Sequence, residues 1–409
     1  MRRARGSSAA SDSAHQAGIT EHMEEEKSTL IGIQMSGDGA QITWYDRTLE
    51  EPQTLSLAGE REDGLLAMPA DAWKGALRGG RFGMQSLSRY ITRLIGMVPG
   101  RPQLQELRIC LTVPNLTQEL GDHLVECLES LGIARRNLFL QDWRTSFFYY
   151  VISMRRELWN GDVAFLRLKD EKIAGSILHI DRSVKPALVT IREIASADVS
   201  DRARAGLSQE DWDRERDRRF YELLGKLFER RSVTTSYLYG TYFDRSWAER
   251  SFQYLTFRRH AFQGQNLFSK GACYSAMMRV GLRQMPDLLF MGVDMVTENI
   301  GMRLRVRGRE QYQLLIPAGV NWYEAHSRID MIPDGEKSVT ILTTPMEGGE
   351  TVGHILRLDH FPERERRATR LRMTIYFTSA HRCEIEVEDL GFGQISPSSG
   401  RVWRRQVAI

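Results

Sequence analysis

The sequence predicts a mixed α/β unit that occurs twice and is followed by a β-sandwich. The duplication is predicted because a hairpin near residues 30–45 leads into alternating helices and strands, and a second hairpin near 162–180 starts the same order again. The sandwich is predicted because, after Pro286, short alternating strands are separated by turn residues. With 409 residues, the chain is long enough for two or three domains.

The first half begins with two β-rich runs, Leu30–Met35 and Gln41–Tyr45, which are joined by the turn Ser36-Gly37-Asp38-Gly39. The apolar spacing of the following runs then alternates between that of a helix and that of a strand. The expected elements are a helix at 82–95, a strand at 107–113, a helix at 120–131, a strand at 137–140 and a helix at 147–158. We assign residues 29–158 to a first lobe.

The second half repeats this order. Residues 162–168 and 173–180 form another predicted hairpin around Lys169-Asp170-Glu171-Lys172, and a polar connection leads to a helix near 220–228. A strand at 236–240 runs into a turn at Gly240-Thr241. The last helix carries small residues that allow close packing, namely Gly271, Ala272, Ser275 and Ala276. We assign residues 159–286 to a second lobe.

Six short strands between residues 303 and 390 make up the predicted sandwich, to which we assign residues 287–395. The tail at 396–409 is expected to be loose and anchored at most by Trp403. Residues 1–28 are expected to form a disordered leader, because they are rich in Arg, Ser, Ala and Gly and lack an apolar core. Met23 is an alternative start of translation.

The composition indicates a cytoplasmic protein and argues against two kinds of partner. The 56 basic and 53 acidic residues leave a net charge of +3, which gives no case for binding nucleic acid or an anionic membrane. No stretch reaches the ~18 uninterrupted apolar residues of a membrane-spanning helix. The four cysteines lie far apart without a metal-type spacing, so we expect reduced thiols and no metal site.

Seven short motifs follow one another in a defined order over residues 29–393. They are Ile31-Gly32-Ile33-Gln34-Met35-Ser36-Gly37, Leu111-Thr112-Val113-Pro114, Gln141-Asp142, Leu238-Tyr239-Gly240-Thr241, Phe268-Ser269-Lys270-Gly271-Ala272-Cys273, Asn299-Ile300-Gly301-Met302 and Ile385-Glu386-Val387-Glu388-Asp389. In this order the motifs resemble those of the DnaK-type heat-shock chaperones and, more widely, of the actin-like ATPases. The run at 262–271 is also similar to a bacterial family of uncharacterised proteins.

The resemblance implies two ribonuclease-H-like lobes with an ATP or ADP site between them. In the active families, glycines at two hairpin turns let backbone N–H groups approach the phosphates. An aspartate at each strand end supports the water shell of Mg²⁺ and orients the attacking water. By position, the resemblance assigns eight residues of this chain to the site: Ser36, Gly37, Asp38, Lys169, Asp170, Gly240, Thr241 and Lys270.

This chain departs from the active pattern at both hairpins. Gln34 occupies the position of the first aspartate, and Arg167 lies near the second, where the glycine run becomes Lys169-Asp170-Glu171. A neutral amide does not hold hydrated Mg²⁺, and the two acids repel a polyanion. We therefore expect no catalytic residue and no magnesium, with ATP or ADP bound weakly or not at all. If the alignment is shifted by a residue or two, Asp38 or Asp170 becomes the metal-side carboxylate.

Three functions are compatible with this pattern. The one that we favour is a DnaK-like pseudo-ATPase scaffold that binds a protein partner, because both phosphate loops depart from the pattern together. The second is a slow chaperone-type ATPase, and the third is an actin-like protein of filaments or cell division. The predicted sandwich favours the chaperone branch over the filament branch.

Overall fold

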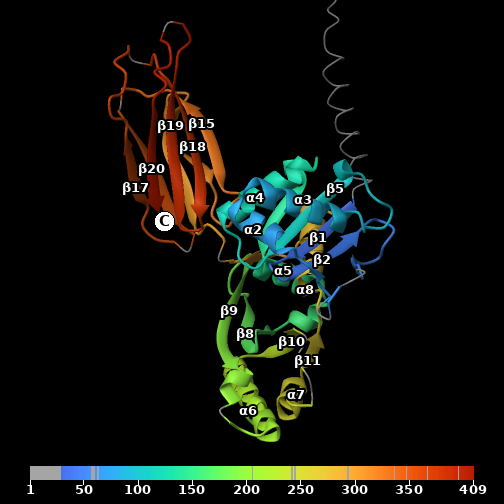
Figure 1. Ribbon diagram of the computed structural model, residues 1–409. Helices are drawn as coiled ribbons and strands as arrows, with labels where there is room; N and C mark the ends of the chain where they lie inside the picture. The colour runs from blue at the N-terminus through green and yellow to red at the C-terminus, as the bar shows by residue number, and fades with distance from the viewer. Residues whose placement is uncertain are drawn as a thin grey trace, which may run out of the picture. The chain divides into compact units, whose positions relative to one another are not determined.

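The computed structural model describes residues 29–409 except 57–59, 62–63, 205, 241–242, 244–245, 293, 336, 347, 366 and 395. The described residues divide into two compact units, one ending at Phe290 and the other spanning Met291–Ile409 (Figure 1). In the described residues the first unit contains helices and strands and the second contains strands, so the predicted fold class is confirmed. The predicted leader at 1–28 lies outside the described residues.

Lobe I of the first unit is a mixed sheet with the strand order β3-β2-β1-β5-β6, and β4 also pairs with β2. The central strand, β1, is buried along its whole length because both faces of the sheet are covered there. The strands are β1 (Thr29–Met35), β2 (Gly39–Tyr45), β3 (Gln53–Thr54), β4 (Leu66–Ala67), β5 (Leu107–Val113) and β6 (Leu138–Asp142). The helices are α2 (Ala70–Arg78), α3 (Arg81–Ile95), α4 (Gln118–Ser130) and α5 (Trp143–Ser153).

Lobe II has the strand order β11-β10-β7-β8-β9-β12. The strands are β7 (Asp162–Lys169), β8 (Lys172–Asp181), β9 (Ala187–Asp198), β10 (Val233–Tyr239), β11 (His260–Gln263) and β12 (Leu288–Phe290). The helices are α6 (Gln209–Phe228), α7 (Glu249–Thr256) and α8 (Leu267–Arg279). β12 pairs in parallel with β9 and therefore belongs to this sheet. The lobe thus extends beyond its predicted end at residue 286.

The two lobes share one topology. In each lobe, three consecutive strands form an antiparallel meander, β1-β2-β3 in lobe I and β7-β8-β9 in lobe II. Two further strands extend the sheet in parallel beside the first strand of the meander, β5 and β6 in lobe I and β10 and β11 in lobe II. Thus β1 and β7 are equivalent, as are β5 and β10. This repetition is the duplication that the sequence predicts.

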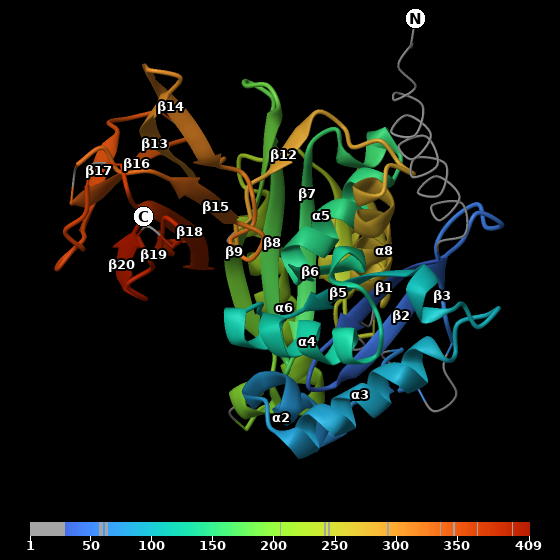
Figure 2. The same cartoon turned by 90° about the horizontal axis from the view of Figure 1, so that it is seen from above.

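Helices α5 and α8 interlock the two lobes (Figure 2). α5 follows the lobe I sheet, but Phe147 and Phe148 pack with Phe165 and other residues of the lobe II sheet. α8 follows the lobe II sheet, but it packs against Leu30 and Cys110 of lobe I. The two helices touch at a glycine, since a Cβ added at Gly271 would lie 1.9 Å from the backbone oxygen of Ser146. The predicted close packing of the small-residue helix is therefore confirmed.

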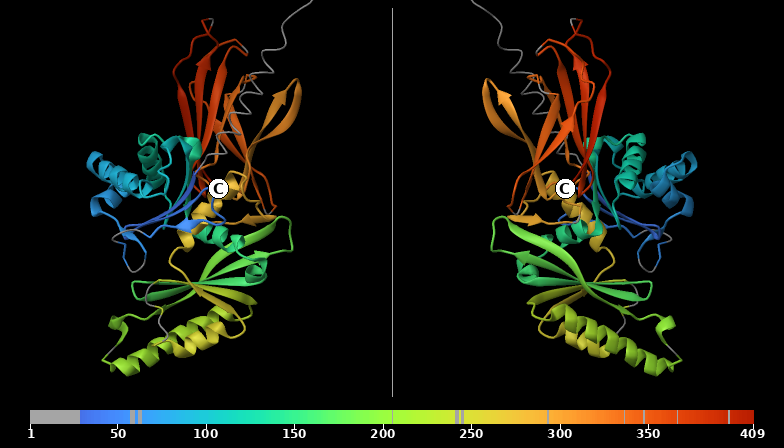
Figure 3. Two further views of the ribbon diagram at one scale, coloured as in Figure 1. Left: turned by 90° about the vertical axis from the view of Figure 1, so that its right-hand side faces the viewer. Right: turned by 90° about the vertical axis from the view of Figure 1, so that its left-hand side faces the viewer.

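The second unit is a sandwich of two four-stranded sheets, ordered β14-β13-β16-β17 and β15-β18-β19-β20 (Figure 3). One apolar cluster, which includes Ile300, Ile341, Met373 and Ile385, fills the space between the sheets. The strands are β13 (Glu298–Val306), β14 (Arg309–Ile316), β15 (His326–Met331), β16 (Ser338–Pro345), β17 (Val352–Arg357), β18 (Arg370–Ser379), β19 (Arg382–Gly391) and β20 (Val402–Ala408).

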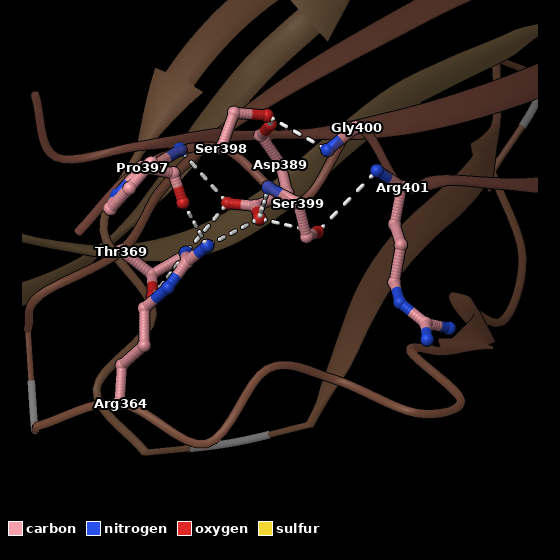
Figure 4. Close-up of polar contacts among 9 residues, drawn as sticks. Arg364, Thr369, Asp389, Pro397, Ser398, Ser399, Gly400 and Arg401 are labelled. Atoms are coloured by element: carbon pink, nitrogen blue, oxygen red, sulfur yellow. Dashed lines mark hydrogen bonds and ion pairs between the residues drawn. The ribbon is translucent and has the colours of Figure 1, made fainter.

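The expectation of a loose tail at 396–409 is wrong, because β20 is the edge strand of the second sheet. It pairs antiparallel with β19, and Trp403 and Val407 are buried opposite Val387 and Cys383. The segment before β20 is held by Asp389 at the end of β19, as Figure 4 shows. The carboxylate of Asp389 accepts hydrogen bonds from the backbone N–H and hydroxyl of Ser399.

Candidate functional site

A cavity of about 250 Å³ lies between the two lobes of the first unit. Residues from three turns line it. The β1–β2 turn contributes Ser36 and Asp38, and the β7–β8 turn contributes residues 169–171. Tyr239 and Gly240, at the end of β10, line a third part of the wall. The cavity is therefore placed where the two equivalent hairpins and the end of β10 converge.

Five of the eight site residues that the sequence assigned line this cavity, namely Ser36, Asp38, Lys169, Asp170 and Gly240. Gly37 and Lys270 are not among the lining residues. A Cβ at Gly37 would lie 3.0 Å from ring atoms of Trp73 on α2, so Gly37 is next to that helix. Thr241 lies outside the described residues. The role of all eight in binding a ligand stays a prediction.

An ion pair joins the tips of the two hairpins. Lys169 Nζ lies 2.7 Å from Asp38 Oδ2, and both side chains are about half exposed. Lys169 is the last residue of β7 and pairs with Lys172, the first residue of β8. Only Asp170 and Glu171 connect the two strands, so this is a two-residue hairpin turn. Both residues have a positive φ, 50° for Asp170 and 55° for Glu171. A two-residue turn of acidic residues does not provide a glycine-rich loop that could surround phosphates.

The strand residues behind the turns differ in the two lobes. Gln34 on β1 lies opposite Thr112 of β5, and Arg167 on β7 lies opposite Tyr239 of β10, so both lie near the ends of the equivalent strands β1 and β7. Gln34 Nε2 donates a hydrogen bond of 2.6 Å to the hydroxyl of Tyr239 and so links the lobes. The guanidinium of Arg167 lies 5.5 Å from the ring centroid of Trp143.

Two polar groups of the cavity lack a partner among the described residues. Gln34 is only 8% exposed, and its Oε1 atom has no hydrogen-bond donor. Gln265 Oε1 is also buried without a donor, although its Nε2 donates to the backbone oxygen of Gly240. Both oxygens are enclosed by protein atoms, so they are unsatisfied acceptors within the wall and not groups that the cavity exposes.

A buried polar network supports the wall on the lobe I side. The hydroxyls of Thr112 and Ser146 hydrogen-bond each other, and Gln141 Nε2 donates to the same Ser146 hydroxyl. Ser275 on α8 donates to Gln141 Oε1 at 2.8 Å. Asp142 caps α5 by accepting from the backbone N–H of Thr145 at 2.8 Å. The network fixes β5, β6, α5 and α8 relative to each other at the cavity.

Sequence reasoning missed several lining residues. Trp143 and Phe268 are nine-tenths buried or more and form an aromatic wall with Tyr239. Trp143 directly follows the Gln141-Asp142 motif, and Phe268 is the first residue of another motif. This proximity to the motifs is the sequence feature that could have identified them as lining residues. Arg61 and Leu65 come from the connection between β3 and β4, and no pattern in the sequence marked them.

The described residues contain no group of three or more His, Cys, Asp or Glu side chains placed to hold a metal ion. Within the same residues, each helix is too short or too polar to cross a bilayer.

Two family comparisons cover most of the chain. Residues 59–293, more than half of the sequence, match the family described as "Family of unknown function (DUF5716) C-terminal". The chain belongs to this family. In this DUF5716 family member, residues 295–409 also match "Domain of unknown function (DUF8552)", and the two matches meet close to the unit boundary at Phe290.

Several solved structures are similar to a part of this DUF5716 family member. An inorganic polyphosphate/ATP-glucomannokinase from Arthrobacter sp. strain KM is 14% identical, with a TM-score of 0.38 over 62% of this chain and 99% of that chain. A protein of unknown function with an actin-like ATPase fold, from Bacteroides thetaiotaomicron, is 10% identical, with a TM-score of 0.31 over 62% and 97%.

A Ppx/GppA phosphatase from Aquifex aeolicus is 9% identical, with a TM-score of 0.33 over 64% of this chain and 95% of that chain. No curated protein sequence matches this chain. The structural similarities concern the fold, and the activities in these names belong to those proteins.

Proposed function

We propose that this DUF5716 family member is a non-hydrolysing scaffold of the actin-like type, whose interlobe cavity binds a small ligand without cleaving a nucleotide. The observation that carries the proposal is the ion pair between Lys169 and Asp38, which closes the gap between the two hairpin tips. In the active pattern, this gap is where the hairpins surround the phosphates.

The residues at the cavity do not fit a magnesium-bound polyphosphate. Mg²⁺ in such sites is held through carboxylates and phosphate oxygens. The two strand positions carry an amide, already bonded to Tyr239, and a guanidinium. Asp38 was the alternative carboxylate, and its charge is compensated by Lys169. Asp170 sits on the short turn, where it would repel a phosphate chain. Binding of ATP or ADP without hydrolysis stays a prediction.

The test is phosphate release from Mg-ATP by the purified full-length chain. We expect the wild type to release no more phosphate than a Gln34→Ala variant, because the neutral amide of Gln34, which is bonded to Tyr239, does not hold hydrated Mg²⁺. Phosphate release by the wild type that Gln34→Ala abolishes would show that the site is a working ATPase.

A second function, binding of a protein partner by the sandwich, is supported by one surface. Tyr312, Leu314 and Ile355 are each more than two-fifths exposed on the sheet β14-β13-β16-β17. Tyr312 and Leu314 lie on the edge strand β14, and Ile355 lies on the opposite edge strand β17. Exposed apolar side chains on an edge strand are available for contact with another protein. The DnaK-like character of this partner binding stays a proposal, since it depends on the resemblance of the motifs alone.

A further inference from the structure

We propose that the sandwich binds a second copy of this chain through β14, whose free edge pairs antiparallel with β14 of the other copy. The inference goes beyond the function proposed for the interlobe cavity. It rests on the second function proposed above, because it names the protein that the exposed residues of β14 contact.

The backbone of β14 has one unpaired side among the described residues. β14 lies at the end of its sheet and pairs only with β13 (Figure 2). Arg307 and Gly308, both with a positive φ, connect the two strands in a two-residue hairpin turn. Hydrogen-bonded and non-hydrogen-bonded pairs alternate from this turn onward. The N–H and C=O groups of Glu310, Tyr312 and Leu314 therefore point away from β13, to the free edge.

The contacts on either side of β13 and β14 agree with this direction. The backbone N–H of Met346 donates to the oxygen of Thr297, which turns the odd-numbered residues of β13 toward β16. Gly301 is one of them and lies opposite Leu314, so the backbone groups of Leu314 face the free edge. The oxygen of Leu314 accepts a hydrogen bond of 3.1 Å from the side chain of its neighbour Gln313. This acceptor thus lies outside the β13–β14 ladder.

The other three edge strands among the described residues of the sandwich are protected against pairing. β15 carries the exposed charged side chains Arg328 and Asp330, which oppose the addition of a strand. β17 and β20 are joined, because the guanidinium of Arg405 donates to the backbone oxygen of Ile355. By contrast, the residues of β14 from 311 to 316 include neither a charged side chain nor a proline. β14 is therefore the edge that is open to another strand.

The occupant that fits this edge is another β14, because the strand is complementary to itself. A two-fold axis beside Gln313 places Tyr312 opposite Leu314 of the second copy, and Leu314 opposite Tyr312 of that copy. Such cross-strand apolar pairs stabilise a sheet. Arg309 and Glu310 then lie at the outer ends of the paired segment, where neither is opposite a like charge. An axis at Tyr312 would instead place Glu310 opposite Leu314.

The contact closes after two copies. A two-fold interface uses the same surface of each partner, so neither β14 edge remains free. The outer edges of the joined sheet are then the two β17 strands, where Arg405 already occupies the backbone oxygen of Ile355. We therefore expect a dimer and not a fibre.

Sedimentation equilibrium of the full-length chain at about 100 µM measures this association, and we expect a dimer. Leu314→Lys should raise the dissociation constant by about tenfold or more, because both cross-strand pairs lose an apolar side chain and a charge is placed on the edge. Ile355→Lys is the matched control. It places the same charge on the other edge strand of the sheet and should dimerise like the wild type.

A disulfide tests the register. At the axis, the two Gln313 residues form a non-hydrogen-bonded pair with a Cα–Cα distance of about 4.5 Å, which a disulfide spans. Gln313→Cys should therefore form a covalent dimer on mild oxidation. The native cysteines are buried, so the wild type should not cross-link. Ile355→Cys, an exposed position on β17, is the control and should also remain uncrosslinked.

A monomeric wild type overturns the inference, as does a dimer that Leu314→Lys leaves unchanged. Cross-linking of Ile355→Cys without cross-linking of Gln313→Cys overturns it as well. The wild-type and cysteine results stand even if Leu314→Lys fails to fold. A monomer contradicts the second copy alone, since β14 is then free for a different protein. Phosphate release from Mg-ATP by the wild type contradicts the function proposed for the cavity and leaves this inference standing.

Discussion

Asp389, at the end of β19, anchors the segment that leads to β20. It is fully buried, and its carboxylate accepts two hydrogen bonds from Arg364, at 2.9 and 2.8 Å, besides those from Ser399 and Gly391 (Figure 4). Burial alone would raise the pKa of Asp389. The bonds from Arg364, Ser399 and the Gly391 backbone outweigh burial and hold the pKa well below its ordinary value.

We predict that Asp389→Asn lowers the free energy of unfolding of the sandwich by about 3–5 kcal/mol, because it leaves the guanidinium of Arg364, whose side chain is only 12% exposed, without a counter-charge. Hydrogen exchange of the β18 and β19 amides measures the loss. Asp330→Asn is the control: Asp330 pairs with Arg372 in an equally bidentate way, but at the surface, and its replacement should change little.

Asp389 also makes the stability of the sandwich depend on pH. Because the pKa of Asp389 is lower in the folded than in the unfolded chain, its contribution is complete above the unfolded value of about 3.9 and is lost as the pH falls toward the folded value. The difference in stability between the wild type and Asp389→Asn should therefore shrink below about pH 4. A difference that stays constant down to pH 3 would contradict this assignment.

At the residue scale, the substitutions at Gln34 and Arg167 could be predicted from the sequence, whereas the ion pair between Lys169 and Asp38 could not. Gln34 and Arg167 were identified as substitutions because the resemblance of the motifs aligns them with the aspartates of the active families. The Lys169–Asp38 ion pair joins residues 131 positions apart, and its formation depends on how two lobes are placed. Local patterns carry no information about that placement.

At the scale of elements, the contact of α5 with α8 gives a sharp prediction. Gly271→Ala should lower the stability of the first unit by about 1–3 kcal/mol or more, because the added methyl group meets the backbone of α5 at Ser146 and one helix must move. Gly225→Ala in α6 is the matched control, since a Cβ there meets nothing within 4 Å. It should gain roughly 0.5–1 kcal/mol through helix propensity. Urea denaturation of the two variants distinguishes these outcomes.

The elements themselves were predictable where apolar residues alternate without interruption. β20 was missed because Arg405 falls between the inward-facing Trp403 and Val407 and breaks the alternation. The guanidinium of Arg405 donates to the backbone oxygen of Ile355 on β17, a contact that no sequence pattern marks. β9 was read as a polar connection, since its second half is only partly buried.

At the scale of the whole molecule, the two units have separate apolar cores. The sandwich core consists of residues from Val296 onward, whereas three clusters formed by described residues of the first unit lie between Leu30 and Phe290. Units with separate cores need not unfold in one cooperative step. We therefore predict two transitions in differential scanning calorimetry of the full-length chain.

The variants above assign these transitions. Asp389→Asn should lower the midpoint of one transition and Gly271→Ala that of the other, by roughly 2–8 °C for each kcal/mol of stability lost. The double variant should show both shifts unchanged, because mutations in separate cores add. If both substitutions lower the midpoint of one shared transition, the units unfold together. Stability would then be a property of the whole chain and not of its two cores.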